Sequence, residues 1–240
     1  MKLKANVQKR NNNEEIELVP GISSAGDNAV KVFPEFFNTI FIDGDITQES
    51  ATEFFKATHY LDLEQDVFIV INSNGGDLHA SVAIRNMIKN IRSQTKVFTT
   101  CVGVAFSASV LLLAAGTKGC RYTIPNSSLM IHTVQLTFGY GNYRTEIRPL
   151  MQSVADLEED FLAILAEEVS KNHKEEIGNK PYKRNFKKIT EHFHRGDSYL
   201  KPDDAKELGV VDHIGLIKLP VVTYEFELSK DENEEGEDNV

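Results

Sequence analysis

Two kinds of hydrophobic pattern alternate along the middle of the chain. Runs rich in apolar and β-branched residues predict short strands, and the run at 66–72 fits a strand buried on both faces of a parallel sheet. Segments in which apolar residues recur every three or four positions predict amphipathic helices. The expected strands lie at 38–47, 66–72, 96–102, 121–124, 129–132 and 210–214, and the expected helices at about 48–62, 79–91, 107–115, 144–171 and 202–208. Strands that alternate with helices indicate an α/β domain with a mainly parallel sheet.

Local signals mark the ends of two of these helices. Thr47 can cap the helix that follows it, and Ser50 stands three residues further on. Pro202 occupies a first-turn position of the last helix, and Gly209 follows the end of that helix. These signals fix the expected boundaries better than the hydrophobic pattern does.

The two ends of the chain differ in composition from its middle part. Residues 1–30 are polar and predict a flexible N-terminal arm, and residues 221–240 predict an acidic C-terminal tail. One folded domain is therefore expected over 31–220. Inside it, the long helix at 144–171 either packs along the body or projects and pairs with a second subunit. Residues 172–194 form a charged segment that leans basic.

Charge and composition exclude several classes of function. The net charge is −10, of which −6 lies in residues 227–240, so the body is mildly acidic and offers no basic stripe to a nucleic acid. No apolar run approaches the roughly 20 residues needed to cross a bilayer, and the N-terminus lacks the apolar stretch of a secretory signal. Cys101 and Cys120 lie in apolar segments and indicate core thiols in a reducing compartment. We therefore expect a cytoplasmic protein without nucleic-acid or membrane partners.

The segment at 99–116 carries the most suggestive chemistry. It begins as a β-rich apolar run, breaks at Gly103, and places Ser107 at the head of a small, apolar, helix-like segment. The first N–H groups of such a helix lack partners, and with the helix dipole they can stabilise a developing negative charge. A nucleophilic serine needs such an oxyanion hole beside it. The simpler interpretation is a buried strand–helix unit whose serine caps the helix.

Two further polar residues stand at the ends of predicted elements. His132 follows the apolar residues 129–131, at a strand end where a sheet presents side chains to a cleft, and Asp197 closes a polar stretch before a helix. A serine nucleophile needs a base to take its proton, and the base needs an acid that fixes its tautomer. Each residue also has an ordinary interpretation, the first as an interior histidine and the second as a helix cap. Their order along the chain is what makes them informative together.

Four segments carry a resemblance to a known family. They are Asn72-Ser73-Asn74-Gly75-Gly76, Gly103-Val104-Ala105-Phe106-Ser107-Ala108, Pro125-Asn126-Ser127-Ser128-Leu129-Met130-Ile131-His132, and Asp197 with Asp204-Ala205 and Leu208-Gly209-Val210-Val211-Asp212. In this order and spacing, from about Thr39 to Ile214, the chain resembles the ClpP family, the proteolytic subunits of the Clp proteases. An α/β-hydrolase would instead run serine, acid, histidine around a G-x-S-x-G elbow, which this chain lacks.

The resemblance implies roles for individual residues. Ser107 would be the nucleophile, His132 the general base and acid, and Asp197 the residue that orients the histidine. The oxyanion hole would be formed by backbone N–H groups of Gly75, Gly76 and Ala108. The activity implied is that of a serine endopeptidase that uses no cofactor and no metal.

The resemblance also implies an architecture and partners. The fold would be the ClpP/crotonase-like α/β fold of repeated ββα units, with a protruding helical handle at about 136–172 and an insertion at about 172–194. The chain would assemble with itself into stacked heptameric rings around a chamber that receives peptides or unfolded proteins. A separate ATP-dependent unfoldase of the AAA+ class would feed that chamber, because the stretch at 116–119 lacks the pattern of a phosphate-binding loop.

The chain departs from the family at several positions near the expected site. Asn74 replaces the usual proline before the glycine pair, Phe106 and Ser109 replace small residues around the nucleophile, and Thr133-Val134 replace the Gln-Pro that usually follows the histidine. A divergent member of this kind could be a phage head-maturation protease, or a catalytically silent ring or scaffold subunit. A third alternative is an acyl-CoA hydratase or isomerase of the related crotonase fold, although such enzymes usually work with carboxylates.

Overall fold

The computed structural model describes residues 29–33, 36–134, 143–170, 180–194 and 196–220, together with 5–8, 13–16 and 222–224. Of residues 5–8, 13–16, 143, 180–182 and 222–224 it describes the backbone alone.

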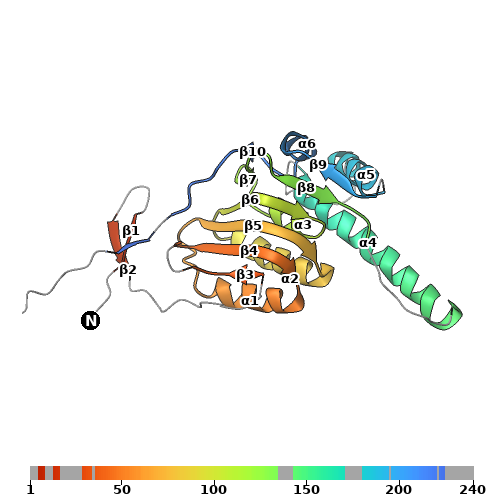
Figure 1. Cartoon of the computed structure of the whole chain (residues 1–240), viewed down its shortest axis with the longest axis horizontal. Helices are drawn as coiled ribbons and strands as arrows, with labels where there is room; N and C mark the ends of the chain where they lie inside the picture. The colour runs from red at the N-terminus through yellow and green to blue at the C-terminus, as the bar shows by residue number, and fades with distance from the viewer. Residues whose placement is uncertain are drawn as a thin grey trace, which may run out of the picture.

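An eight-stranded sheet forms the centre of the molecule (Figure 1). Its strands are β3 (Val30–Lys31), β4 (Thr39–Ile46), β5 (Val67–Gly76), β6 (Val97–Phe106), β7 (Arg121–Thr123), β8 (Ser128–Ile131), β9 (Ser198–Leu200) and β10 (His213–Ile214). The main path runs β10-β7-β6-β5-β4-β3, and β8 pairs with the far end of β6 and with β9. Only the β3–β4 and β8–β9 pairs among these are antiparallel. The prediction of an α/β fold with a mainly parallel sheet is confirmed.

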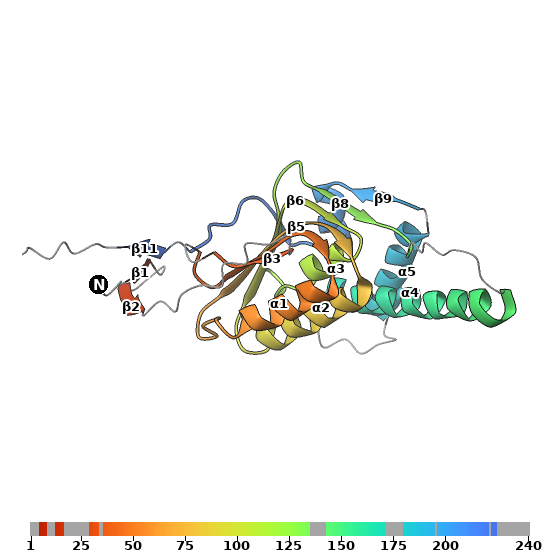
Figure 2. The same cartoon turned by 60° about the horizontal axis from the view of Figure 1, so that its bottom comes forward.

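Six α-helices accompany this sheet in the described part of the chain. They are α1 (Gln48–Thr58), α2 (Leu78–Arg92), α3 (Ser109–Ala114), α4 (Arg148–Val169), α5 (Lys180–Phe193) and α6 (Pro202–Leu208), with one π-helical turn at Tyr143–Ile147 before α4. Helices α1 and α2 lie side by side against one face of the sheet (Figure 2). The predicted helix ends are confirmed, because Thr47 and Ser50 form a capping box and Gly209 ends α6 with a φ of +88°.

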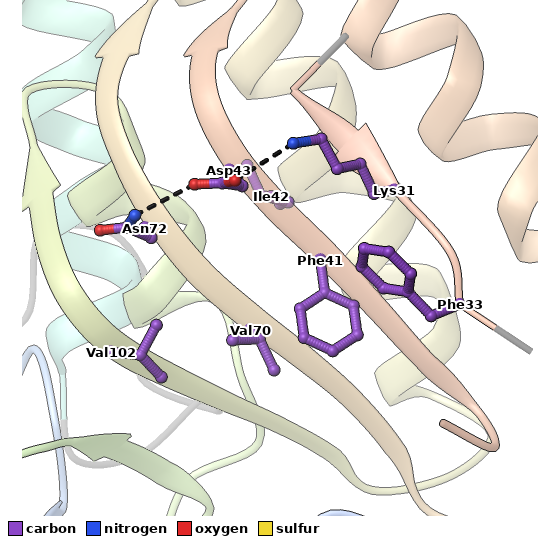
Figure 3. Close-up of a pocket in the computed structure, with 8 residues that line it drawn as sticks. All are labelled: Lys31, Phe33, Phe41, Ile42, Asp43, Val70, Asn72 and Val102. Atoms are coloured by element: carbon purple, nitrogen blue, oxygen red, sulfur yellow. Dashed lines mark hydrogen bonds and ion pairs between the residues drawn. The ribbon is translucent and has the colours of Figure 1, made fainter. Parts of the chain in front are cut away.

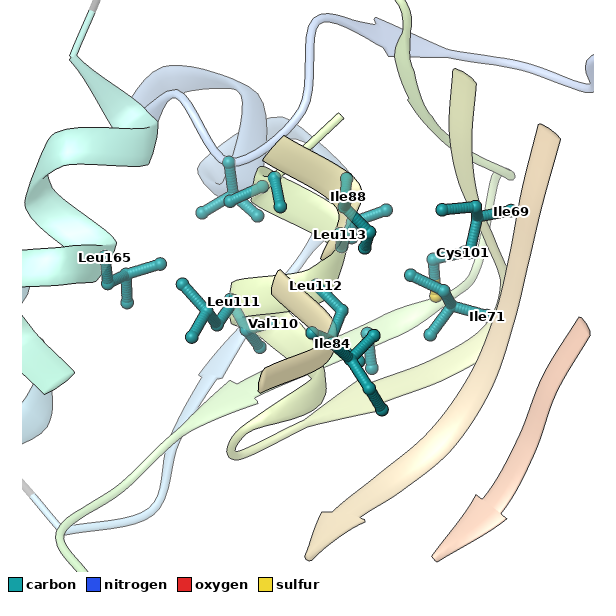
Figure 4. Packing of buried hydrophobic residues seen from close by; sticks show 14 of the residues in the cluster. Ile69, Ile71, Ile84, Ile88, Cys101, Val110, Leu111, Leu112, Leu113 and Leu165 are labelled. Atoms are coloured by element: carbon teal, nitrogen blue, oxygen red, sulfur yellow. The ribbon is translucent and has the colours of Figure 1, made fainter. Parts of the chain in front are cut away.

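The hydrophobic core lies between the sheet and α2, α3 and α4. Ile69 and Ile71 point from β5 toward Ile84 and Ile88 of α2, and α3 packs among them (Figure 4). All six residues of α3 are buried, which explains why that helix is apolar on every side. Helix α4 joins this core only through its C-terminal half, from Phe161 onward, and its N-terminal half projects from the body (Figure 1).

Two features of the fold differ from the sequence-based expectations, and a third adds to them. Strand β6 does not break at Gly103 but continues to Phe106, because a register shift in the β5–β6 pair lets the Asn72 side chain accept the Val104 N–H at 3.2 Å. Helix α3 therefore begins at Ser109, not at Ser107. Residues 180–193 of the expected insertion form helix α5, whose Ile189 and Phe193 are buried.

Several expected segments lie wholly or partly outside the described residues. Strands β1 (Ala5–Gln8), β2 (Asn13–Ile16) and β11 (Val222–Tyr224) form a separate antiparallel sheet, so short pieces of the expected arm and tail pair with each other. The rest of the arm up to residue 28 and of the acidic tail lies outside the described residues. So do residues 135–142, which include the start of the expected handle, and residues 171–179, which include the end of the handle and the start of the expected insertion.

Two further expectations concern cysteines and membranes. Cys101 and Cys120 are buried and free, as predicted for core thiols, and burial raises the pKa of both. Among the residues that were described, no helix has the length and apolar character required to span a bilayer.

Candidate active site

Ser107 lies in a sharp turn between β6 and α3. Its φ is +55°, in the left-handed region that serine rarely adopts. The Ser107 N–H donates to the Met130 carbonyl at 2.7 Å, while the N-cap of α3 is Ala108 and makes no side-chain cap bond. The interpretation of Ser107 as a helix cap is therefore wrong. The turn instead leaves its hydroxyl without a hydrogen bond to any described residue, at a backbone strain typical of functional sites.

Gly75 lies directly against this turn. A Cβ added at Gly75 would meet the Phe106 carbonyl oxygen at 2.5 Å, the Ser107 Cβ at 2.9 Å and the Ala108 nitrogen at 3.1 Å. Its φ is +92°, which also favours glycine. The Gly75 N–H already donates to the Ser73 hydroxyl at 3.0 Å. Gly75 is therefore not a free oxyanion donor, contrary to its expected role, and it contributes the space that lets β5 approach Ser107.

The other two expected oxyanion donors, Gly76 and Ala108, differ from Gly75 in their backbone hydrogen bonds. The Asp77 N–H donates to the Ile46 carbonyl at 2.8 Å, and Gly76 is the residue of β5 that pairs with Ile46. In this parallel pattern the N–H of Gly76 points away from β4. The Ala108 N–H has no acceptor among the described residues. Of the three expected oxyanion donors, Ala108 therefore has an N–H without an acceptor among the described residues, and Gly76 has an N–H that the pairing with β4 does not use.

A buried serine, Ser109, stabilises the turn at Ser107 through its hydroxyl group. Ser109 donates its hydroxyl to the Phe106 carbonyl at 2.7 Å and also lies 3.0 Å from the Ser73 carbonyl. It is completely buried. Ser109, one of the departures from the family near the expected nucleophile, thus connects the Ser73 carbonyl of β5 to the Phe106 carbonyl at the end of β6.

His132 and Asp197 face each other across the end of the β8–β9 pair. Ile131 pairs with Ser198 in the antiparallel register, so the next positions along each strand are His132 and Asp197. The His132 Nδ1 lies 3.8 Å from the Asp197 Oδ1, and their side chains are 13% and 54% exposed. This distance allows an ion pair but is too long for a hydrogen bond. The buried Nδ1 atom has no hydrogen-bond partner among the described residues.

The topology brings all three expected catalytic residues to one edge of the sheet. Phe106 pairs with Met130 in the β6–β8 ladder, so Ser107 lies next to the end of β8 that leads into His132. No hydrogen bond joins Ser107 to His132 within the described part of the chain. The residues are therefore assembled by backbone pairing, without a closed chain of side-chain hydrogen bonds.

Two contacts around this edge could not be read from the sequence pattern. Glu158 of α4 accepts the Val134 N–H at 2.8 Å through Oε1. His192 of α5 lies with Nδ1 2.9 Å from the Ser198 hydroxyl, one residue beyond Asp197. Among the described residues no three His, Cys, Asp or Glu side chains cluster in a way that could hold a metal ion.

A buried ionic cluster contacts the C-terminal end of α3, the end opposite Ser107. Glu168 of α4 is fully buried and accepts from Arg85 Nε at 2.6 Å and from Arg92 Nη1 at 2.8 Å. Arg92 also donates to the Ala115 carbonyl at 2.6 Å, where the orphan carbonyls of the α3 C-terminus need donors. The cluster therefore connects α2, α3 and α4.

Lys118 and Arg121 extend this cluster. Both donate to the backbone carbonyl of Glu168. Burial, followed by the nearby Arg121 charge, lowers the pKa of Lys118 to about 7. Arg121 pairs with Asp212 at 2.6 Å. Burial raises the pKa of Asp212, but the hydrogen bonds and charge of Arg121 outweigh it and hold that pKa below its usual value.

A pocket of about 290 Å³ lies on the sheet face turned away from α1 and α2 (Figure 3). Phe33, Phe41, Val70 and Val102 form its apolar wall. At one end Asp43 accepts from Lys31 at 3.1 Å and from Asn72 at 3.0 Å. The pocket is separate from the edge that carries Ser107 and His132, although β5 contributes to both.

A comparison with protein families gives a match over most of the chain. The family model described as Clp protease matches residues 24–218 of the 240 residues. The matched region contains the turn at Ser107, the glycine pair, His132 and Asp197.

Proposed function

The chain belongs to the Clp protease family, a family of serine peptidases, and from this premise we propose that it is a serine endopeptidase acting through Ser107, His132 and Asp197. The observation that carries the proposal is the left-handed turn at Ser107. This turn frees the hydroxyl and sets it against the backbone of Gly75 and Ala108. A purely structural serine would gain nothing from that strain.

In the first step, the Ser107 Oγ attacks the carbonyl carbon of the scissile peptide bond while His132 takes its proton. The carbonyl π electrons move onto the oxygen, and the N–H groups of Gly76 and Ala108 stabilise the resulting oxyanion. His132 then gives the proton to the leaving amine, the C–N bond breaks, and an acyl ester remains on Ser107. Asp197 stabilises the imidazolium that exists between the two proton transfers.

In the second step, water replaces the amine. His132 removes a proton from the water as its oxygen attacks the ester, and the same two N–H groups stabilise the second oxyanion. Collapse of this intermediate breaks the ester bond and returns the proton to Ser107. The carboxylic acid leaves, and the site regains its starting state.

We place this chemistry inside an oligomeric chamber built from copies of the chain, fed by a separate ATP-dependent unfoldase, in the cytoplasm. The family supports self-assembly and peptide substrates in general. The projecting N-terminal half of α4, with the exposed Leu150 and Met151, is suited to contact another copy. Heptameric rings and the AAA+ partner are proposals taken from the family resemblance.

A second candidate is a catalytically silent subunit of the same fold. It is favoured by the distance of 3.8 Å between His132 and Asp197 and by the unpartnered Nδ1 of His132. A histidine without a hydrogen-bonded acid is a weaker base. In this alternative the chain keeps the residues of the triad but does not align them.

The test is the turnover of a small fluorogenic peptide by the wild type and by Ser107→Ala, after both are sized by light scattering. We expect cleavage by a large oligomer that falls at least a thousand-fold in the variant. Labelling by a serine-directed fluorophosphonate should be lost in the same variant. An assembled wild type that neither cleaves nor labels would favour the silent subunit.

A further inference from the structure

The chain leaves the sheet after Ile131, so His132 is the first residue outside it. Strand β8 ends at Ile131, and residues 132–134 belong to no ladder. The neighbouring strand β9 begins at Ser198, which pairs with Ile131, so Asp197 also lies outside the sheet. The direction of the His132 side chain therefore depends on contacts outside the sheet.

One side-chain contact fixes the path of this segment within the described residues. The Glu158 Oε1 of α4 accepts the Val134 N–H at 2.8 Å. A bond from a peptide N–H to a carboxylate is stronger than one between neutral groups. It joins two elements that are 24 residues apart in sequence.

The position of Glu158 on α4 distinguishes it from its acidic neighbours. Glu159 and Asp160 are exposed and face solvent, whereas Glu158 is partly buried. It lies just before Phe161, where α4 begins to pack on the core. The carboxylate thus projects from the turn of α4 that directly precedes the part anchored in the core.

His132 needs an external constraint because its own ring has none. The Nδ1 atom is buried and unpartnered, and the nearest acid oxygen lies at 3.8 Å. A base whose tautomer and orientation are not fixed by a hydrogen bond relies on its backbone for placement. A shift of the backbone at 133–134 would move the imidazole relative to Ser107 and Asp197.

We propose that Glu158 is a positioning residue for His132, acting through the Val134 N–H. The proposal rests on the proposed peptidase function and adds to it a residue that touches neither the substrate nor the reacting atoms. Glu158 holds the segment after β8 against α4, and this contact sets the direction from which the imidazole approaches the serine.

The experiment compares Glu158→Ala, Glu158→Gln and the control Glu159→Ala in peptide cleavage. Alanine removes the acceptor and should lower kcat about tenfold with KM within twofold, because a lost hydrogen bond displaces the base and leaves substrate binding intact. Glutamine keeps an acceptor oxygen at the same place and should restore kcat to within about threefold of the wild type. Glu159→Ala should match the wild type. Equal kcat for Glu158→Ala and the wild type would overturn the proposal.

A second readout separates this proposal from the peptidase function itself. Amide hydrogen exchange at Val134 and the imidazole ¹⁵N shifts of His132 are measured on the same proteins, whether or not they cleave peptide. We expect faster exchange at Val134 and shifted His132 signals in Glu158→Ala only. Unchanged His132 signals would refute the positioning role even if Ser107-dependent cleavage is observed. Shifted signals in a protein that does not cleave would support the positioning role and count against the peptidase.

Discussion

The two halves of the candidate active site are built in different ways. The half around Ser107 lies on the parallel sheet and on α3, where Gly75, Ser109 and the hydrogen bond to the Met130 carbonyl constrain the backbone of the turn. The half around His132 and Asp197 stands on the short β8–β9 pair, and Asp197 is 54% exposed. The proposed nucleophile is thus positioned by the core of the protein, and the proposed base is positioned by a short strand pair at its periphery.

This difference assigns separate physical tasks to the two halves. An oxyanion hole acts through donors that are fixed before the reaction, so it gains from a rigid core. A proton-transferring histidine needs a partner within hydrogen-bond distance, and here about 1 Å of closure separates Nδ1 from Asp197. Mutations in the first half should therefore affect folding and activity together, and mutations in the second half should affect activity alone.

The largest effect is expected for Gly75→Ala. The added methyl would overlap the Phe106 carbonyl and the Ser107 Cβ at a φ of +92°, so the free energy of unfolding should fall by about 3 kcal/mol or more and cleavage should be lost. Gly119→Ala is the matched control, with a φ of +85° and no atom within 4 Å of the new Cβ. It should cost about 1 kcal/mol and leave cleavage unchanged. Chemical denaturation and peptide turnover measure both, and equal losses in the two variants would contradict the constraint on Ser107.

Glu168→Gln tests the support behind α3. Removing the buried charge leaves Arg92 without its acid and Arg85 with only the more exposed Glu167, which should lower the free energy of unfolding by about 3–5 kcal/mol. Glu167→Gln is the control, because Glu167 is 32% exposed and its pairs with Arg85 and Lys89 should contribute about 1 kcal/mol or less. Thermal unfolding of both variants measures the difference. Similar melting temperatures would show that the buried cluster does not stabilise this half.

Asp197→Asn probes the other half. We expect kcat to fall about a hundredfold, because the imidazolium loses its counter-charge. The free energy of unfolding should change by less than about 0.5 kcal/mol, because the side chain is 54% exposed. Asp203→Asn, an exposed acid in the first turn of α6, should leave both quantities unchanged. A large loss of stability in Asp197→Asn would contradict the prediction that mutations in this half affect activity alone.

The ionic cluster should show a pH dependence of stability that is small for each pH unit. The pKa of Lys118 is about 7 in the folded protein and 10.5 in its ordinary state. Between these values the folded state binds fewer protons than the unfolded state, so this lysine makes stability rise with pH, by at most about 1.4 kcal/mol per unit. Denaturation of the wild type and Lys118→Met between pH 7 and 10 measures the contribution. A wild type that does not gain stability relative to the variant would contradict it.

Local patterns predicted much of the fold and little of the geometry that connects its parts. The buried run at 66–72, the cap at Thr47 and the glycine after α6 follow from neighbouring residues alone, and the structure contains all three. The continuation of β6 beyond Gly103 depends on the Asn72 side chain from another strand, which no local pattern contains. The sequence does contain a signal for helix α5, because Phe186, Ile189 and Phe193 recur at helical spacing within the charged segment at 172–194.

The candidate site shows the same limit. The sequence placed Ser107, His132 and Asp197 near element ends, and family order assigned their roles. It could not show that the Gly75 N–H is taken by Ser73, or that Glu158 holds the segment after His132, because both depend on the final position of a side chain. The separation of 3.8 Å between the histidine and the aspartate likewise depends on how β8 and β9 end, not on which residues they contain.

The left-handed backbone of Ser107 has a consequence for how this fold can change over generations. Glycine adopts a φ of +55° without strain, so exchanging the serine for glycine would relax the turn while abolishing the nucleophile. A lineage that no longer needs the proposed reaction can therefore lose it by a single substitution at Ser107 and keep the rest of the fold for other uses.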